Sequence, residues 1–192
     1  MSLWVKYCGI RCIEDAEFAI HLGVDAIGVV VVPSSPRCAI RRELRSISRI
    51  RRGQAKLVLV TQDQARDDVV ECLELLEPDL IQFHGNENRE FSESFELPYI
   101  KATKDPVYLE YLREHRSAFA HLVDSEVFVA SEIRDLPRLI IAGGLTCENV
   151  AERISMHKPW GVDVSRGIER SPGVKDQTLM RHFLQAVRGA LR

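Results

Sequence analysis

Short apolar runs alternate along this chain with segments of helical periodicity. The run at 24–32 is almost entirely apolar, which is typical of a strand buried on both faces of a parallel sheet. Residues 13–23 place Ala16, Ala19 and Ile20 roughly on one helical face. Strands that alternate with helices in this way indicate successive βαβ units.

The pattern predicts eight strands, at 3–7, 24–32, 55–60, 79–85, 98–103, 119–124, 139–144 and 160–165. Eight parallel strands close into a (β/α)8 barrel, whereas open doubly wound sheets usually have fewer. Residues 125–138, between the sixth and seventh strands, are too few for a full helix with two loops. We therefore predict an α/β fold, a single (β/α)8 TIM barrel over 1–192 with a shortened sixth βα unit.

Composition agrees with one globular domain. The 192 residues are 45% hydrophobic and 28% charged, which is ordinary for a chain with one packed core. The formal net charge of −2 provides no basic field that would attract nucleic acid or an anionic membrane. No apolar run approaches the roughly 20 residues needed to span a bilayer, and no signal-peptide pattern opens the chain. We expect a cytoplasmic protein with no nucleic-acid or membrane partner.

The cysteine pattern indicates free thiols. Five cysteines, an odd number, are spread over the chain at Cys8, Cys12, Cys38, Cys72 and Cys147. This spread fits a reducing compartment better than a disulfide framework. Cys8 and Cys12 are four residues apart, but no second pair at ligand spacing accompanies them. We expect no metal site.

The arginine-rich segment 40–52 has two interpretations. It could contact RNA, but Ile40, Leu44, Ile47 and Ile50 recur at helical spacing. That spacing favours an amphipathic helix with a solvated basic face, because no aromatic residues for base stacking accompany the arginines.

Functional side chains of such barrels gather at the carboxyl ends of the strands. These positions are unusually polar here, with Lys6, Cys8, the PSSPR loop at 33–37, Gln82, His84, Lys101, Asp124 and the segment 163–167. Each residue also has a structural interpretation: Cys8 as a buried filler thiol, His84 as a core histidine, Asp124 as a helix N-cap. Their coincidence at one end of the predicted barrel indicates a site.

Two segments near the C-terminus favour anion binding. Residues 142–150 contain Gly143 and Gly144 before a helix that we predict to begin near Thr146, and 163–169 add amides, a hydroxyl and a guanidinium. Glycine lets backbone amides approach an anion, and a helix N-terminus adds a favourable partial charge. The loops after strands 7 and 8 are the usual phosphate site of this fold. Two ordinary glycine turns are the alternative.

Taken together, these motifs resemble the phosphoribosylanthranilate isomerase family of tryptophan biosynthesis. The resemblance spans nearly the whole chain and is carried by VKYCGIRCIEDA (5–16), GVDAIGVVVVPSSPR (23–37), IQFHGNE (81–87), YIKA (99–102), HLVDS (121–125), IIAGGLTCENV (140–150) and GVDVSRGIERSPGVKD (161–176). It implies an Amadori rearrangement of N-(5-phosphoribosyl)anthranilate to 1-(2-carboxyphenylamino)-1-deoxyribulose 5-phosphate, with no cofactor and no metal.

The resemblance also implies residue roles. Cys8 is the general base that removes the C2 proton, and Asp124 is the general acid that protonates the ring oxygen. Arg37 holds the anthranilate carboxylate, and His84 and Asp163 contact the substrate. The phosphate group is held by Gly143, Gly144, Ser165, Arg166 and Gly167.

These roles set two electrostatic expectations. A basic thiol needs a cation that lowers its pKa, and Lys6 lies on the same face of the same strand as Cys8. An acidic Asp124 needs a raised pKa, from apolar surroundings or a neighbouring negative charge.

The chain departs from the family pattern in two places, and this leaves alternatives open. Residues 125–138 contain no glycine where the family is glycine-rich, and Arg166 stands where a second serine is common. We expect residues 125–134 to gain order over bound substrate. A paralogue acting on a related aminoaldose phosphate and a non-catalytic phosphosugar-binding protein are the alternatives. The sequence is compatible with a monomer or a homodimer.

Overall fold

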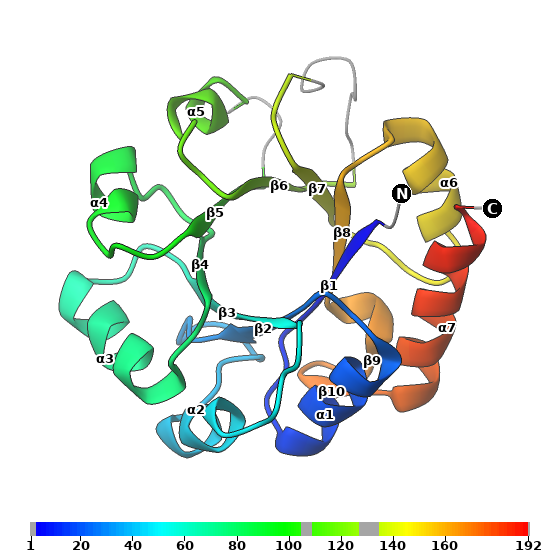
Figure 1. Cartoon of the computed structure of the whole chain (residues 1–192), viewed down its shortest axis with the longest axis horizontal. Helices are drawn as coiled ribbons and strands as arrows, with labels where there is room; N and C mark the ends of the chain where they lie inside the picture. The colour runs from blue at the N-terminus through cyan, green and yellow to red at the C-terminus, as the bar shows by residue number, and fades with distance from the viewer. Residues whose placement is uncertain (1–2, 105–108, 127–134, 192) are drawn as a thin grey trace.

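The computed structural model describes residues 3–104, 109–126 and 135–191, in which eight parallel strands form a closed barrel in the order β1 to β8 (Figure 1). The strands are β1 Trp4–Cys8, β2 Ala26–Val30, β3 Lys56–Thr61, β4 Leu80–Phe83, β5 Tyr99–Thr103, β6 Ala120–Asp124, β7 Leu139–Ala142 and β8 Gly161–Val164. Every predicted strand is present within the segment that the hydrophobic pattern indicated or one residue beyond it. The predicted (β/α)8 barrel is therefore confirmed.

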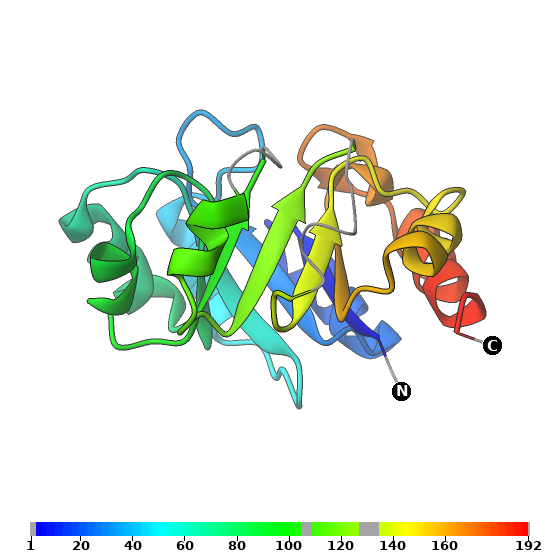
Figure 2. The same cartoon turned by 90° about the horizontal axis from the view of Figure 1, so that it is seen from above.

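Helices surround the barrel and cover the outer face of the sheet (Figure 1). They are α1 Ile13–Leu22, α2 Arg41–Ser48, α3 Arg66–Leu76, α4 Arg89–Glu93, α5 Leu109–Glu114, α6 Val150–His157 and α7 Gln177–Gly189. After β8 the chain forms a 3-10 turn, η3 Arg166–Ile168, and a small antiparallel pair, β9 Glu169–Ser171 with β10 Val174–Lys175. Figure 2 shows this small pair on one side of the barrel and the N-terminus towards the other.

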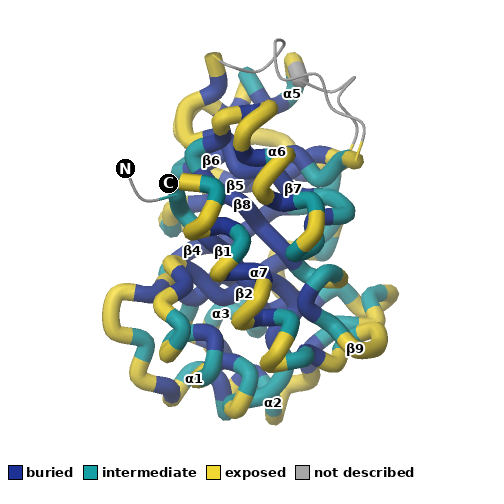
Figure 3. Tube along the Cα trace, turned by 90° about the vertical axis from the view of Figure 1, so that its right-hand side faces the viewer, coloured by how far each residue is buried: buried dark blue, intermediate teal, exposed yellow. Residues whose placement is uncertain are grey.

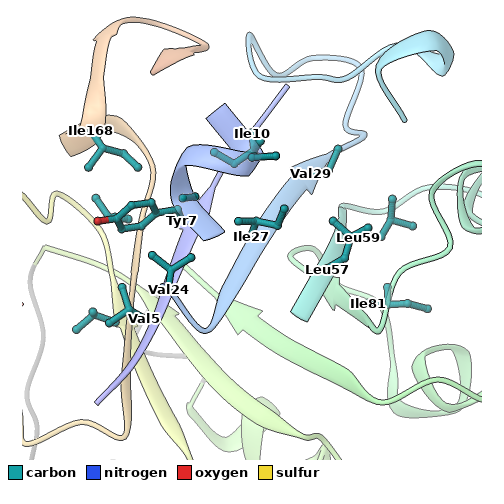
Figure 4. Packing of buried hydrophobic residues seen from close by; sticks show 14 of the residues in the cluster. Val5, Tyr7, Ile10, Val24, Ile27, Val29, Leu57, Leu59, Ile81 and Ile168 are labelled. Carbon is teal, nitrogen blue, oxygen red and sulfur yellow. The ribbon is translucent and has the colours of Figure 1, made fainter. Parts of the chain in front are cut away.

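The sheet separates two apolar layers. Side chains such as Tyr7, Ile27 and Leu59 point outward and pack beneath the helices (Figure 4). Smaller residues, including Ala26, Ala102 and Ala120, line the barrel interior. The alternation follows from the period of two along a strand. The exposed residues lie mainly on the outer helices and in the loops (Figure 3).

Aromatic side chains close the amino-terminal end of the barrel. Trp4 stacks on Trp160 with ring centroids 5.2 Å apart, and Phe119 meets Trp160 edge-on at 5.9 Å. The guanidinium of Arg138 lies 4.6 Å from the centre of the Phe119 ring. Each aromatic residue lies at or just before the start of its strand. A ligand that enters the barrel must therefore use the opposite, carboxyl end.

Two sequence-based boundaries are wrong. Ile40 is the residue before α2 rather than part of its apolar face; it is 54% exposed, while Leu44, Ile47 and Ile50 are buried as expected. Its backbone N–H donates to Glu43 Oε2 at 2.8 Å, which fixes the start of the helix.

The second difference concerns α6, which begins at Val150 and not near Thr146. Asn149 accepts a hydrogen bond from the Thr146 backbone at 2.9 Å and donates to the Gly144 carbonyl at 2.8 Å. These bonds hold a turn ahead of the helix. The helix N-terminus consequently lies farther from the glycines than the sequence indicated.

The sixth βα unit is short, as predicted. β6 ends at Asp124 and β7 begins at Leu139, and no helix lies in the described residues between them. Arg153 of α6 donates from Nη2 to the Ser125 carbonyl and from Nη1 to the Glu126 carbonyl, each at 2.8 Å. The expectation that residues 125–134 gain order with substrate falls mainly on 127–134, which lie outside the described residues.

No helix in the ranges 3–104, 109–126 and 135–191 is long and apolar enough to cross a membrane. The five cysteines are free thiols, in agreement with the sequence-based expectation.

Candidate active site

A cavity of about 480 Å³ opens at the carboxyl end of the barrel. Every residue to which the family resemblance assigns a role lines it, namely Cys8, Arg37, His84, Asp124, Gly143, Gly144, Asp163, Ser165, Arg166 and Gly167. The sequence did not identify Gln62 and Lys104, which also face the cavity. Parallel strands bring these distant segments together because their carboxyl ends share one edge of the sheet.

One lysine that the sequence placed near the site lies elsewhere. Lys101 points to the outer face of β5, where its Nζ is 3.0 Å from Glu87 Oε2 and donates to the Gly85 carbonyl at 2.8 Å. Lys104, three residues later, reaches the cavity instead. Lys101 lies two residues after Tyr99 and so shares the outward face of β5, whereas Ile100 and Ala102 face the barrel interior.

Cys8 is the last residue of β1 and points into the barrel, where it is 7% exposed. Burial raises the pKa of its thiol, while Lys6 and Lys175 act in the opposite direction. Burial is the larger effect, so the pKa lies above its usual value. The expectation that a nearby cation makes this pKa low overall is therefore wrong, although the cation is present.

Lys6 is fully buried on the same inner face and forms an ion pair with Asp163, 2.9 Å from Nζ to Oδ1. The two residues are neighbours in the register of β1 and β8. Burial is the largest single effect and lowers the pKa of Lys6, but Asp163 and Cys8 together outweigh it and hold that pKa above its usual value. Asp163, expected as a substrate contact, thus has one oxygen engaged by Lys6.

Asp124 faces His84 across the cavity, with 3.3 Å between Oδ2 and Nε2. Gln82 Nε2 lies 3.0 Å from the other ring nitrogen, Nδ1. Burial raises the pKa of Asp124, but His84, Lys104 and Arg166 together outweigh it and hold the pKa below its usual value. The expectation of a raised pKa at Asp124 is therefore wrong, because sequence reasoning did not foresee that His84 would reach this carboxylate.

Arg37 is held by a residue that the sequence analysis missed. Its Nε and Nη2 donate to the two oxygens of Glu169, at 2.8 and 2.6 Å. Lys175 donates to Glu169 Oε1 at 2.9 Å and to the Ser165 carbonyl at 3.0 Å. One edge of the Arg37 guanidinium is thus occupied, which leaves Nη1 and the second hydrogen of Nη2 for a ligand. Glu169 and Lys175 lie within the segment 161–176 that carries the family resemblance.

Gly143, Gly144 and Gly167 occupy positions where a side chain would be strained or would clash. Gly143 and Gly144 have φ angles of +84° and +62°, a region that favours glycine. A Cβ on Gly167 would lie 2.0 Å from the Leu145 carbonyl oxygen, so the loops after β7 and β8 pack directly on each other. Within the part of the chain that the structure describes, the backbone N–H groups of Gly143 and Gly144 donate no hydrogen bond. They are available to an anion.

Arg166 lies at the exposed edge of this region, with Nη2 3.5 Å from Glu126 Oε1. The pair is largely exposed and contributes little to stability. Arg166 can therefore exchange Glu126 for another anion at low cost. Among the described residues, no three His, Cys, Asp or Glu side chains are grouped closely enough to hold a metal ion.

A closed parallel barrel with its polar cavity at the carboxyl end defines a (β/α)8-barrel enzyme. Residues 5–186 match the family model of N-(5'-phosphoribosyl)anthranilate (PRA) isomerase. This match covers nearly the whole chain and shows that the chain belongs to the PRA isomerase family.

Curated relatives and solved structures support the same family assignment. The N-(5'-phosphoribosyl)anthranilate isomerase of Alcanivorax borkumensis is 37% identical, covering 96% of this chain and 94% of its own. That of Stenotrophomonas maltophilia is 34% identical, covering 97% and 93%. The crystal structure of phosphoribosyl anthranilate isomerase from Thermotoga maritima has a TM-score of 0.89 at 29% identity, covering 97% and 99%. A phosphoribosyl anthranilate isomerase in complex with reduced 1-(o-carboxyphenylamino)-1-deoxyribulose 5-phosphate has a TM-score of 0.88 at 31% identity, with the same coverage.

Proposed function

We propose that this chain catalyses the Amadori rearrangement of N-(5-phosphoribosyl)anthranilate in tryptophan biosynthesis, with Cys8 as general base and Asp124 as general acid. Membership of the PRA isomerase family over nearly the full chain supports the reaction. The observation that carries the residue roles is that Cys8 and Asp124 face one cavity from different strands. Two separate proton transfers need two groups placed in this way.

In the first step the ring oxygen takes a proton from Asp124 while the C1–O bond breaks. The nitrogen lone pair forms a C1=N bond, which gives an iminium. Because its pKa is held low, Asp124 is a carboxylate near neutrality and must first receive a proton. His84, 3.3 Å away, is the neighbour placed to pass one on.

In the second step the Cys8 thiolate removes the proton from C2, and the C–H electron pair forms a C1=C2 bond as the iminium nitrogen becomes neutral. The enolamine then gains a proton at C1 and loses the proton of its 2-hydroxyl, which gives the ketose. Hydrogen moves only as a proton in both steps, so we expect no cofactor.

The remaining residues are proposed to orient the substrate. The free N–H groups of Gly143 and Gly144, with Ser165, Arg166 and Gly167, are suited to the phosphate. The open edge of Arg37 is suited to the anthranilate carboxylate, since a guanidinium donates two parallel hydrogen bonds. We also propose a cytoplasmic location and one barrel domain, as a monomer or a homodimer.

Complementation tests the proposal. The chain, expressed in a bacterial strain that lacks this isomerase, is expected to restore growth without tryptophan, and Cys8→Ser is the matched control. Growth restored by both forms would assign the base to another residue. Failure of both, with phosphate binding retained, would favour a paralogue with another aminoaldose phosphate or a binding protein.

A further inference from the structure

A buried ammonium group lies beside the thiol of Cys8. Lys6 has no exposed surface, and its chain runs along the inner face of β1 towards the cavity. The ion pair with Asp163 fixes the position of its Nζ from the neighbouring strand β8. An ion pair buried at the centre of a barrel is costly to form, and its stabilising value is small compared with an apolar pair. Its position next to a reactive residue suggests another use.

Gly28 provides the space in which the two groups meet. It is the register partner of Cys8 on β2. A Cβ at Gly28 would lie 3.0 Å from Cys8 Sγ and 3.0 Å from Lys6 Nζ, tighter than most such contacts, so these atoms would have to shift by a few tenths of an ångström. Sγ and Nζ therefore both border the small space that a Cβ at Gly28 would occupy.

Burial and the charged groups around Cys8 shift the pKa of its thiol in opposite directions. Burial raises the pKa of the thiol, and Asp163 on β8 also raises it. Lys6 on β1 and Lys175 on β10 lower it, and the effect of Lys6 is larger than that of Asp163. A thiolate at this buried position needs a compensating cation, since an isolated buried charge is strongly disfavoured.

We propose that Lys6 is a positioning residue that stabilises the thiolate of Cys8 once the thiol loses its proton, with Asp163 locking the ammonium in place and Gly28 leaving room for the contact. The proposal rests on the proposed role of Cys8 as general base. Lys6 touches no reacting atom in this account and acts only through the sulfur.

The first test is Lys6→Met, which keeps an unbranched side chain and removes the charge. The rate at which iodoacetamide alkylates Cys8, followed by mass spectrometry of the Cys8 peptide without substrate, gives the thiol pKa. We expect this pKa to rise by at least about one unit, the lower range for loss of a neighbouring opposite charge. At neutral pH kcat is expected to fall by about 10-fold or more, with KM changed less and activity recovering at higher pH.

Lys101→Met is the matched control. Lys101 is equally buried on a strand and equally paired, with 3.0 Å between Nζ and Glu87 Oε2, but it faces the helices. Its removal is expected to lower stability and leave the alkylation profile of Cys8 unchanged. An equal shift in both variants would overturn the proposal, because the effect would then come from general loosening of the barrel.

Two further variants isolate the cause. Lys6→Met/Asp163→Asn removes both charges, so a shift that persists there belongs to the lost ammonium and not to an unpaired carboxylate. Gly28→Ala keeps every charge and requires Sγ or Nζ to shift by a few tenths of an ångström, and this disturbed contact is expected to raise the thiol pKa as well. A wild-type profile in either folded variant overturns the proposal. Turnover retained in Cys8→Ser would instead overturn the proposed base and leave the alkylation result intact.

Discussion

At the scale of single residues, neither proposed catalytic group is in its reactive state by itself. Burial holds the pKa of Cys8 above its usual value, although a base requires the thiolate. His84 and nearby cations hold the pKa of Asp124 low, although an acid requires the proton. We therefore propose that both functions depend on a neighbour: Lys6, which offsets part of the effect of burial on the thiol, and His84, which passes a proton to the carboxylate.

Replacement of Cys8 by serine tests the base. We expect kcat to fall by at least about 100-fold, the lower range for losing a general base. A serine hydroxyl is far less acidic than a thiol, whereas the change in volume is small. Cys72→Ser, on the outer helix α3, is the control and is expected to turn over at the wild-type rate. Turnover of Cys8→Ser within a few-fold of wild type would contradict the assignment.

Arg37→Lys tests the carboxylate site. We expect binding of an anthranilate-bearing product analogue to weaken by roughly 1.5–3 kcal/mol, the scale of a charged hydrogen bond. Glu169 already takes one edge of the guanidinium, and a lysine cannot pair with Glu169 and a ligand through two fixed edges at once. Isothermal calorimetry measures the change, with Arg41→Lys on α2 as control. An unchanged affinity would make Arg37 a structural partner of Glu169 only.

At the scale of elements, the loops after β6, β7 and β8 form one packed unit. A Cβ on Gly143 would lie 2.6 Å from the Ser125 backbone nitrogen, and Gly167 packs on the Leu145 carbonyl. Arg153 fixes the start of the sixth loop through the carbonyls of Ser125 and Glu126. The phosphate site that we propose is thus part of the scaffold that carries Asp124.

Gly167→Ala tests this packing. The added Cβ would lie 2.0 Å from a backbone oxygen, so the loops after β7 and β8 must separate. We expect affinity for inorganic phosphate to fall by about 10-fold or more, since backbone donors bind an anion only when they converge. Gly189→Ala is the control, because a Cβ there meets no atom within 4 Å. Unchanged phosphate affinity in Gly167→Ala would place the anion elsewhere.

The periodicity of the chain predicted the elements well and their ends less well. Strand positions follow from apolar runs, which depend only on local sequence. The start of α6 was missed because Asn149 ties the preceding turn to Gly144, and Ile40 was misplaced because Glu43 fixes the helix start. In both cases the hydrogen bonds of one side chain decided the boundary, and periodicity does not report such bonds.

At the scale of the whole molecule, the sequence predicted which residues gather but not how they pair. The barrel brings every residue with a role implied by the resemblance to one cavity, whereas Lys101 lies outside it. The ion pairs Lys6–Asp163 and Arg37–Glu169 join residues 157 and 132 positions apart. The first depends on the register of β1 and β8, and the second on the packing of β9 against the loop after β2. The pKa direction at Cys8 follows from its burial and that at Asp124 from its contact with His84, and neither can be read from local sequence.

Thermal unfolding with and without inorganic phosphate tests the barrel and its proposed site together. β1 pairs with β8, so the two ends of the chain close one sheet, and we expect a single cooperative transition. A ligand that binds only the folded state at about 100 times its Kd stabilises it by about 2.7 kcal/mol. For a domain of this size that corresponds to a rise in Tm of about 5–10 °C. Crystals grown with phosphate or sulfate are expected to hold the anion between Gly144 and Gly167, bound mainly by backbone N–H groups. Two separate transitions would contradict the single domain, and an unchanged Tm at saturating phosphate would contradict the anion site.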